Sequence, residues 1–471
     1  MVLAIMVWRH SAPLPFPTPA QQDLMVLTQP GVLTYDDSDP ENVSGFEHDL
    51  VELFARELGV GVRYVVASSD QIPTLLKANR AHLAAAWLTP TNESTGQRSS
   101  PAFWDSHDIL VQPEASLPID DLSELAGRTI HVLAGSRQAA TLRALQKAIS
   151  DMKIVEVTKL SAFELLESVA ARHIELAVAD AAVVDVALQI APSIQASLEL
   201  GKPRPITWSF PDDVNPELER RANEFLARIR NDPAFARLKD RYFGHVRRLE
   251  SDDIARLIEL GKTTLPRLRA SFQAAQIASG IDWRLLAALA YQESQWNSNA
   301  TSPTGVRGIM MLTDETADRL GVSNRLDAEQ SILAGARYLN ILRQQMPADT
   351  PEPDRTWLAL AAYNIGPGHF NAALTIGRQL GANTQAWHEM KRILPLLAKP
   401  QYYRRLKAGR ARGGEAVILV ENVRSFYDIL SRHQSPLRSF RATRDSLPPA
   451  GFRPADGELS QGDTIFSSPP M

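Results

Sequence analysis

The stretch Leu285–Leu312, LLAALAYQESQWNSNATSPTGVRGIMML, begins as an apolar helix and ends in a loop rich in serine, proline and glycine. On a repeat of 3.6 residues, Leu289, Glu293 and Trp296 share one stripe with the preceding leucines. A carboxylate on this stripe is partly desolvated, which raises its pKa, and a protonated carboxyl can act as a general acid. Glu293 is therefore a candidate functional residue, although a glutamate at a helix end can also extend to water.

The composition describes a globular protein that is large enough for more than one domain. The chain has 471 residues, of which 44% are hydrophobic and 22% are charged. The net charge of −4 gives no support for nucleic-acid binding. The absence of cysteine excludes disulfides and thiolate metal sites, and no GxGxxG or GxxxxGK[ST] motif is present. We therefore predict no metal site and no cofactor.

The two ends of the chain lack the patterns of a folded domain. Residues 1–22 are predicted to be an apolar remnant, MVLAIMV, followed by a Pro-rich tether. A truncated export signal and a misassigned start are both open explanations for the apolar part. No apolar run reaches the roughly 18 residues needed to span a bilayer. Residues 434–471 contain six prolines and are predicted to be a disordered tail.

The rest of the chain divides into two domains of different class. Within 23–247, short β-rich runs such as HLAAAWLT and TIHVLAGS alternate with helical ones such as RQAATLRALQKA. This alternation predicts an α/β domain. Residues 248–267 are predicted to be a linker, and the successive amphipathic helices of 268–433 predict an all-α domain.

Several blocks of the α/β domain resemble, in order, the extracellular solute-binding proteins that capture amino acids. They are GFEHDLVELFARELGV, HLAAAWLTPTNE, LAGRTIHVLAGSRQAATL, ELAVAD and ARLKDRYFGHV. The resemblance implies a two-lobed, periplasmic-binding-protein-like domain that closes around a ligand, with an Arg that clamps the ligand's carboxylate. Ser94 stands where we align that Arg, so an amino acid and a muropeptide are both open as ligands.

Two residues of the α/β domain are predicted to contact this ligand. Ser136, at the start of a helix, can donate to a carboxylate. Asp180, at the end of ELAVAD, can pair with an ammonium group. The alternative is that Ser136 is only a helix cap and Asp180 only a turn residue at the end of a strand.

The sequence around Glu293 resembles the catalytic block of lytic transglycosylases with the goose-lysozyme-like fold. ESQWNSNATSPTGVRGIMML is followed in order by AEQSILAGARYLNIL, LALAAYNIGPG and KPQYYRRLKAGRARGGEAVILVENVRSFY. The resemblance implies cleavage of the β-1,4 bond between N-acetylmuramic acid and N-acetylglucosamine in peptidoglycan, with a 1,6-anhydromuramoyl product. It also implies that Glu293 protonates the glycosidic oxygen and then deprotonates the 6-hydroxyl of the same sugar.

The same resemblance implies five residues that bind the glycan. Ser302 matches a serine that helps to hold the substrate's acetamido group or the catalytic carboxyl. Tyr363 and Asn364 match a Tyr-Asn pair, in which the tyrosine hydrogen-bonds the catalytic carboxyl and walls the cleft. For Asn364 a role in fixing its own loop is the favoured alternative to a glycan contact. Met310 and Met311 occupy a segment where many relatives have Met-Gln, and a role in packing is equally open for both.

Together, the two resemblances predict a peptidoglycan lytic transglycosylase whose α/β domain senses a ligand and modulates cleavage. The substrate and the resemblance place it in the periplasm, peripheral to the outer membrane. Leu419 stands where relatives usually have a Tyr that faces the substrate, which keeps open a catalytically weak, peptidoglycan-binding sensor. A lysozyme-type hydrolase that releases reducing ends is the other alternative.

Overall fold

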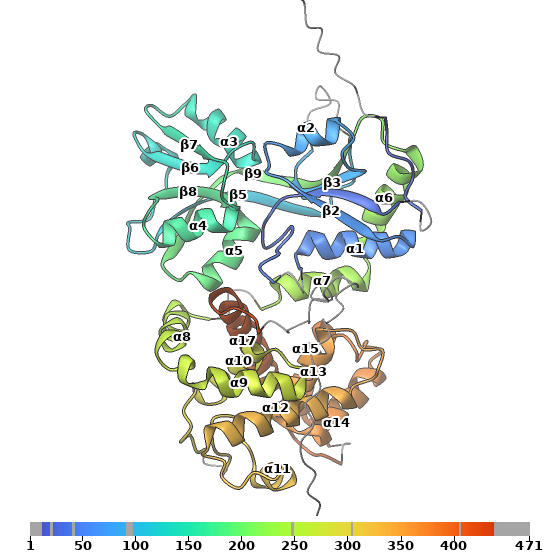
Figure 1. Ribbon diagram of the computed structural model, residues 1–471, viewed down its shortest axis with the longest axis vertical. Coiled ribbons are helices and arrows are strands. Elements are labelled where there is room, and N and C mark those ends of the chain that lie inside the picture. The colour runs from blue at the N-terminus through green and yellow to red at the C-terminus, as the bar shows by residue number, and fades with distance from the viewer. Residues whose placement is uncertain are drawn as a thin grey trace, which may run out of the picture. The chain divides into compact units, whose positions relative to one another are not determined.

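The computed structural model describes residues 12–18, 22–39, 43–90, 98–245, 249–302, 305–404 and 407–437. The apolar start and nearly all of the predicted tail lie outside these residues. The described residues up to Pro436 belong to one compact unit, in which an α/β part precedes a helical part along the chain (Figure 1). The predicted fold class, α/β followed by all-α, is confirmed.

The α/β part is built on one continuous sheet. Its strands are β1 (Leu24–Thr28), β2 (Val62–Val66), β3 (Leu83–Leu88), β4 (Arg98–Ser99), β5 (Trp104–Pro113), β6 (Thr129–Leu133), β7 (Lys153–Val157), β8 (Leu176–Asp180) and β9 (Ile194–Phe210). Their order is β2-β1-β3-β9-β5-β8-β6-β7, and β4 also pairs with β9. β1, β2 and β3 are parallel on one side, and β6, β7 and β8 are parallel on the other.

Two long strands join these halves into two lobes. β9 is antiparallel to β3 through Ser209 and Thr207, and to β5 along Ile194–Ile206. β5 in turn is antiparallel to β8. The lobe of β1–β3 is called lobe 1 below, and the lobe of β6–β8 is called lobe 2. The lobes are therefore connected by continuous strands.

Helices cover the sheet on both faces (Figure 1). They are α1 (Phe46–Leu58), α2 (Ile72–Lys77), α3 (Arg137–Gln146), α4 (Ala162–Ala170), α5 (Ala181–Ile190), α6 (Pro216–Ile229) and α7 (Pro233–Phe243), with a 3₁₀ helix at Leu122–Leu125. α1 illustrates how the sequence forms them. Its apolar face buries Phe46, Leu50 and Phe54, and Gly59 ends the helix in the left-handed conformation.

The helical part follows from Ser251 onward. Its elements are α8 (Ser251–Thr263), α9 (Leu265–Ser279), α10 (Trp283–Ser294), α11 (Asp314–Arg319), α12 (Ala328–Gln345), α13 (Asp354–Ile365), α14 (Pro367–Gln379), α15 (Trp387–Ile393), η3 (Leu394–Ala398), α16 (Pro400–Tyr403) and α17 (Gly413–His433). α8 and the start of α9 occupy the segment 248–267 that was predicted as a linker. Among the described residues, no helix combines the length and hydropathy needed to cross a bilayer.

α10 lies at the centre of the helical part. The carboxylate of Asp282 caps it by accepting the backbone N–H of Arg284 at 2.8 Å. Every residue from Trp283 to Tyr291 is buried, because α9, α12 and α17 all pack against this helix. A helix that is apolar on nearly all sides is stable only inside a core, so the core of the helical part positions Glu293.

Candidate functional site

The end of α10 carries Glu293 and is fixed by the residues that follow it. Gln295 and Trp296 have φ values of 53° and 62°, so the chain turns sharply away from the helix axis. The indole Nε1 of Trp296 donates to the carbonyl oxygen of Ala287 at 2.8 Å. This bond packs the indole ring back onto α10 and fixes the last turn.

The Glu293 carboxyl is desolvated and has no stabilising partner among the described residues. The side chain is partly buried. Burial raises the pKa of Glu293 to about 8, and no hydrogen bond or ion pair within the described structure opposes this rise. The carboxyl is therefore mainly protonated at neutral pH, and the exposed part of the side chain can be reached by a ligand.

Tyr363, on α13, lies near Glu293 but bonds to a backbone carbonyl. Its hydroxyl donates to the carbonyl oxygen of Met310 at 2.8 Å. Burial, followed by the neighbouring Glu293 and Tyr338, raises the pKa of Tyr363 well above its usual value. The hydrogen bond that was predicted from Tyr363 to the carboxyl is therefore made to Met310 instead.

Ser302 and residues 305–312 lie beside the end of α10, and these described residues are together called the 302–312 loop below. Ser302 begins the loop with a turn, in which its N–H donates to the carbonyl oxygen of Val306 at 3.0 Å. Its hydroxyl oxygen accepts the Val306 N–H at 3.3 Å. The hydroxyl of Ser294 donates to the carbonyl oxygen of Ile309 at 2.8 Å, which attaches the loop to the end of α10.

The remaining predicted glycan contacts differ in exposure. The Met310 side chain is 0% exposed and packs against Gly335 of α12. A side chain without exposed surface cannot contact a glycan, so the alternative role in packing applies to Met310, and its carbonyl is the group that faces Tyr363. Met311, with a φ of 48°, is partly buried, and Asn364 is exposed. Both retain surface that a substrate can reach.

α17 contributes a core residue and a link to α10. Leu419 is 4% exposed, so it lies in the core and does not face a substrate. Asn422, one turn later, donates from its side-chain nitrogen to the side-chain oxygen of Gln292 at 3.1 Å. The residue that precedes Glu293 is thereby tied to α17.

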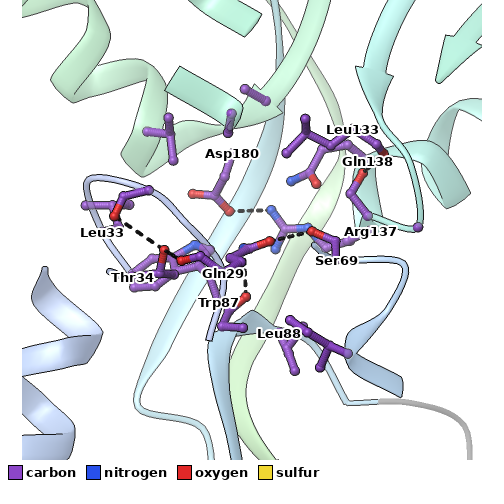
Figure 2. A pocket seen from close by; sticks show the side chains of 18 of the residues that line it. Gln29, Leu33, Thr34, Ser69, Trp87, Leu88, Leu133, Arg137, Gln138 and Asp180 are labelled. Atoms are coloured by element: carbon purple, nitrogen blue, oxygen red, sulfur yellow. Dashed lines mark hydrogen bonds and ion pairs between the residues drawn. The ribbon is translucent and has the colours of Figure 1, made fainter. Parts of the chain in front are cut away.

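A cavity of about 270 Å³ lies in the α/β part and is lined by residues of both lobes (Figure 2). It is called the cleft below. Most of its lining is apolar and includes Leu33, Ile72, Trp87, Leu133 and Phe163. Ser136 and Asp180 also line the cleft, as the sequence predicted. Ser94, which aligns with the carboxylate-clamping Arg of solute-binding proteins, lies outside the described residues.

Both of these predicted residues also cap helices. The hydroxyl of Ser136 accepts the N–H of Ala139 at 3.2 Å at the start of α3 and donates to the carbonyl oxygen of Leu133 at 2.7 Å. The carboxylate of Asp180 accepts the N–H of Ala182 at 2.9 Å at the start of α5. Both residues therefore have a structural role of the kind that the sequence left open as the alternative to ligand binding.

Arg137 is a residue of the cleft that sequence reasoning missed. It pairs with Asp180 at 2.5 Å and with Asp108 at 2.8 Å, and Figure 2 shows its guanidinium turned toward Asp180. Burial raises the pKa of Asp180, and the charge of Arg137 opposes the rise. A cation in the first turn of a helix is unfavourable for the helix dipole, and this misplaced charge in GSRQ was the signal available in the sequence.

The described residues contain no group of three or more His, Asp or Glu side chains that could hold a metal ion. The groups that the structure brings together at the end of α10 are Glu293, Tyr363 and the 302–312 loop. A single protonated carboxyl beside a structured loop is suited to proton transfer to a bound ligand.

Comparisons with known proteins define the class to which this architecture belongs. The model of bacterial extracellular solute-binding proteins, family 3, matches residues 25–245, and the transglycosylase SLT domain matches residues 270–385. The class is therefore a solute-binding-type domain followed by a transglycosylase domain. The chain belongs to the membrane-bound lytic murein transglycosylase F family.

Relatives along the whole chain support this assignment. Membrane-bound lytic murein transglycosylase F of Methylobacillus flagellatus is 41% identical and aligns with 90% of this chain and 91% of its own. The protein of the same name from Thiobacillus denitrificans is 38% identical over 96% of both chains. Among solved structures, an ancestral arginine-binding protein bound to arginine is 21% identical, with a TM-score of 0.43, and covers 47% of this chain and 98% of its own.

Proposed function

We propose that the protein is a peptidoglycan lytic transglycosylase that cleaves the β-1,4 bond between N-acetylmuramic acid and N-acetylglucosamine and leaves 1,6-anhydro-N-acetylmuramic acid ends. The observation that carries this proposal is the Glu293 carboxyl. It is desolvated, has a pKa of about 8 and lies within the matched transglycosylase domain. Such a group holds a proton at neutral pH and can release it to a leaving oxygen.

The reaction needs one carboxyl that acts twice. Glu293 donates its proton to the glycosidic oxygen as the bond from that oxygen to C1 of the muramoyl residue breaks. The resulting carboxylate then removes the proton of the muramoyl 6-hydroxyl, whose oxygen forms the new bond to C1. Most glycosidases use two carboxyl groups. Asp314 and Glu315, which follow the loop in the sequence, are exposed on α11, and Asp314 pairs with Arg325, so neither is assigned to the reaction.

Four groups around Glu293 are proposed to hold the glycan. The hydroxyl of Ser302 and the side chains of Met311 and Asn364 supply contacts from the loop and from the end of α13. The ring of Tyr363 forms a wall beside the carboxyl and restricts the entry of water. Exclusion of water favours attack by the sugar's own 6-hydroxyl over hydrolysis.

Mass spectrometry of sacculus digests tests the proposal. We expect the wild-type protein to release anhydro-muropeptides, and Glu293→Gln to lower the rate by at least about 100-fold, because the proton donor is lost. Glu315→Gln removes an exposed carboxylate of the neighbouring helix and should retain the activity. Products with reducing ends would support a lysozyme-type hydrolase. Sacculus binding without soluble products would support the sensor alternative.

The α/β part is proposed to bind an amino acid or a muropeptide in its cleft and to modulate cleavage. Asp240 of α7 accepts a hydrogen bond from Arg424 of α17 at 3.1 Å and also pairs with Lys391. α17 bonds in turn to the residue before Glu293 through Asn422. These contacts supply a physical connection between the two parts.

The modulation can be measured on the full chain. Calorimetric titration with single amino acids and with purified muropeptides should identify which of the two classes binds. The bound ligand should change the rate of sacculus digestion, and Asp240→Asn should weaken that change while ligand affinity stays the same. If the ligand changes the digestion rate of Asp240→Asn as much as that of the wild type, Asp240 takes no part in the coupling.

The location is proposed from the substrate. Peptidoglycan lies in the periplasm, and the relatives carry the description membrane-bound. We propose a periplasmic protein with peripheral association to the outer membrane. Fractionation of cells, followed by salt and detergent extraction of the membranes, tests this location.

A further inference from the structure

A side chain outside the 302–312 loop closes the base of that loop. Arg325 lies between α11 and α12, and its Nη1 donates to the carbonyl oxygen of Gly305 at 3.0 Å. The same nitrogen donates to the carbonyl oxygen of Leu312 at 2.9 Å. Since these acceptors lie toward opposite ends of the loop, one guanidinium group ties the two ends together.

The loop also packs directly on the backbone of residue 325. Gly308 has a φ of 84°, and a Cβ added there would lie 1.8 Å from the carbonyl oxygen of Arg325. Only glycine fits this approach. The Arg325 side chain is 13% exposed, so its hydrogen bonds form where little water competes, and bonds from a charged donor are strong in such surroundings.

Two carbonyl groups that bond to residues close to Glu293 lie between these two anchored ends. The carbonyl oxygen of Met310 accepts the hydroxyl of Tyr363, and the carbonyl oxygen of Ile309 accepts the hydroxyl of Ser294. A shift of the loop base would therefore move acceptors that hold both the aromatic wall and the end of α10. Small displacements of this kind are costly for catalysis, because the reaction requires close alignment of the reacting groups.

We infer that Arg325 is a positioning residue for the lytic reaction, because it ties Gly305 to Leu312 and thereby fixes the 302–312 loop against Glu293. Arg325 acts through the loop and does not contact the glycan. The inference rests on the proposed function, since it assigns Arg325 to the same reaction. When the loop base loosens, the carbonyl contacts of Tyr363 and Ser294 shift and water gains access to the carboxyl.

Kinetic comparison of three full-length variants tests the inference. Arg325→Gln removes the charged donor, and Arg325→Lys keeps the charge but replaces the planar guanidinium by a single ammonium group. Asp314→Asn is the matched control, because it removes the ion pair of Arg325 and leaves both carbonyl acceptors in place. Initial rates on sacculi are measured from pH 5 to pH 9, together with the melting temperature of each variant.

We expect Arg325→Gln to lower kcat by about 10- to 100-fold, with a smaller change in KM. Arg325→Lys should keep part of the kcat that Arg325→Gln loses. We also expect the alkaline limb of the kcat profile to move to lower pH, because a hydrated Glu293 carboxyl releases its proton more readily. Asp314→Asn should behave as the wild type. A merely structural role would lower the melting temperature without moving the alkaline limb.

Three results would overturn the inference. These are an unchanged kcat in a folded Arg325→Gln protein, a loss of kcat in Asp314→Asn as large as that in Arg325→Gln, and an alkaline limb of the Arg325→Gln profile that stays at the wild-type pH. If Arg325→Gln fails to fold, the same measurements are made on Arg325→Lys, and the same results in that variant would overturn the inference. A wild-type protein that forms no anhydro products would refute the proposed function itself, which separates that failure from failure of the Arg325 assignment.

Discussion

Replacement of Glu293 by glutamine should stabilise the protein while it greatly lowers the activity. The folded protein holds this carboxyl in a desolvated position with a pKa of about 8, against an ordinary value of 4.5. Above pH 4.5 the unfolded chain releases the proton, whereas the folded chain keeps it until about pH 8. A group whose pKa is raised on folding in this way lowers the stability of the fold as pH rises through that interval.

The magnitude follows from the interval. Each pH unit between the two values costs the fold about 1.4 kcal/mol, so the penalty approaches about 3 kcal/mol at pH 7. Glutamine has nearly the same shape and carries no charge, so Glu293→Gln removes the penalty. We expect the variant and the wild type to have similar free energies of unfolding at pH 4. The variant should gain stability steadily up to about pH 8, where the gain levels off.

Denaturant unfolding of both proteins at several pH values, followed by tryptophan fluorescence, measures this difference. Glu315→Gln is the control, because it removes an exposed carboxylate and should change stability by less than about 0.5 kcal/mol at every pH. A constant difference between Glu293→Gln and the wild type across the pH range would refute the reasoning, as would a loss of stability at pH 7. Either result would mean that water reaches the carboxyl freely in the folded protein.

Three further predictions concern the reaction and the cleft. The kcat of the wild type should fall as pH rises through about 8, because the general acid Glu293 loses its proton there; a pH–rate profile on sacculi checks this. Tyr363→Phe keeps the ring but removes the bond to the loop, and kcat should fall about tenfold with the protein still folded. Gly135→Ala should weaken ligand binding in calorimetry, because its Cβ would lie 2.5 Å from the Cα of Asp70 in the opposite lobe. Gly127→Ala is the control, since Gly127 has a similar φ of 72° and no atom within 4 Å of an added Cβ.

The sequence predicted the fold class and the position of Glu293 because both depend on local periodicity. Continuous apolar runs predicted buried strands such as β3, and the stripe from Leu289 to Trp296 placed Glu293 on the buried side of α10. The segment 248–267 was predicted as a linker, yet α8 and the start of α9 form there. α8 buries Ile254 and Leu257 on one face, so a helical period was present in the sequence, but a period alone does not tell whether a segment at a domain boundary packs onto a domain.

Features that depend on tertiary contacts could not be predicted. The charge in the first turn of α3 singles out Arg137, but its pairing with Asp108 and Asp180 joins α3, β5 and β8, and no spacing in the sequence reveals that these meet. The role of Met310 was also hidden, because a motif identifies a residue but does not distinguish its buried side chain from its carbonyl. The contact of Tyr363 with this carbonyl joins α13 to a loop that lies far away in the sequence, so it could not be predicted.

The long strand β9 has a mechanical consequence for the α/β part. Because it is hydrogen-bonded to β3 in lobe 1 and to β5 over most of its length, opening of the cleft must twist a continuous β-ribbon and cannot proceed by strand separation. Elastic deformation of this ribbon stores energy in proportion to the opening angle squared. The free energy of closing the lobes around a ligand therefore includes a change in this elastic energy, and stiffening substitutions in the ribbon should alter the capture rate even though they touch neither the ligand nor the glycan.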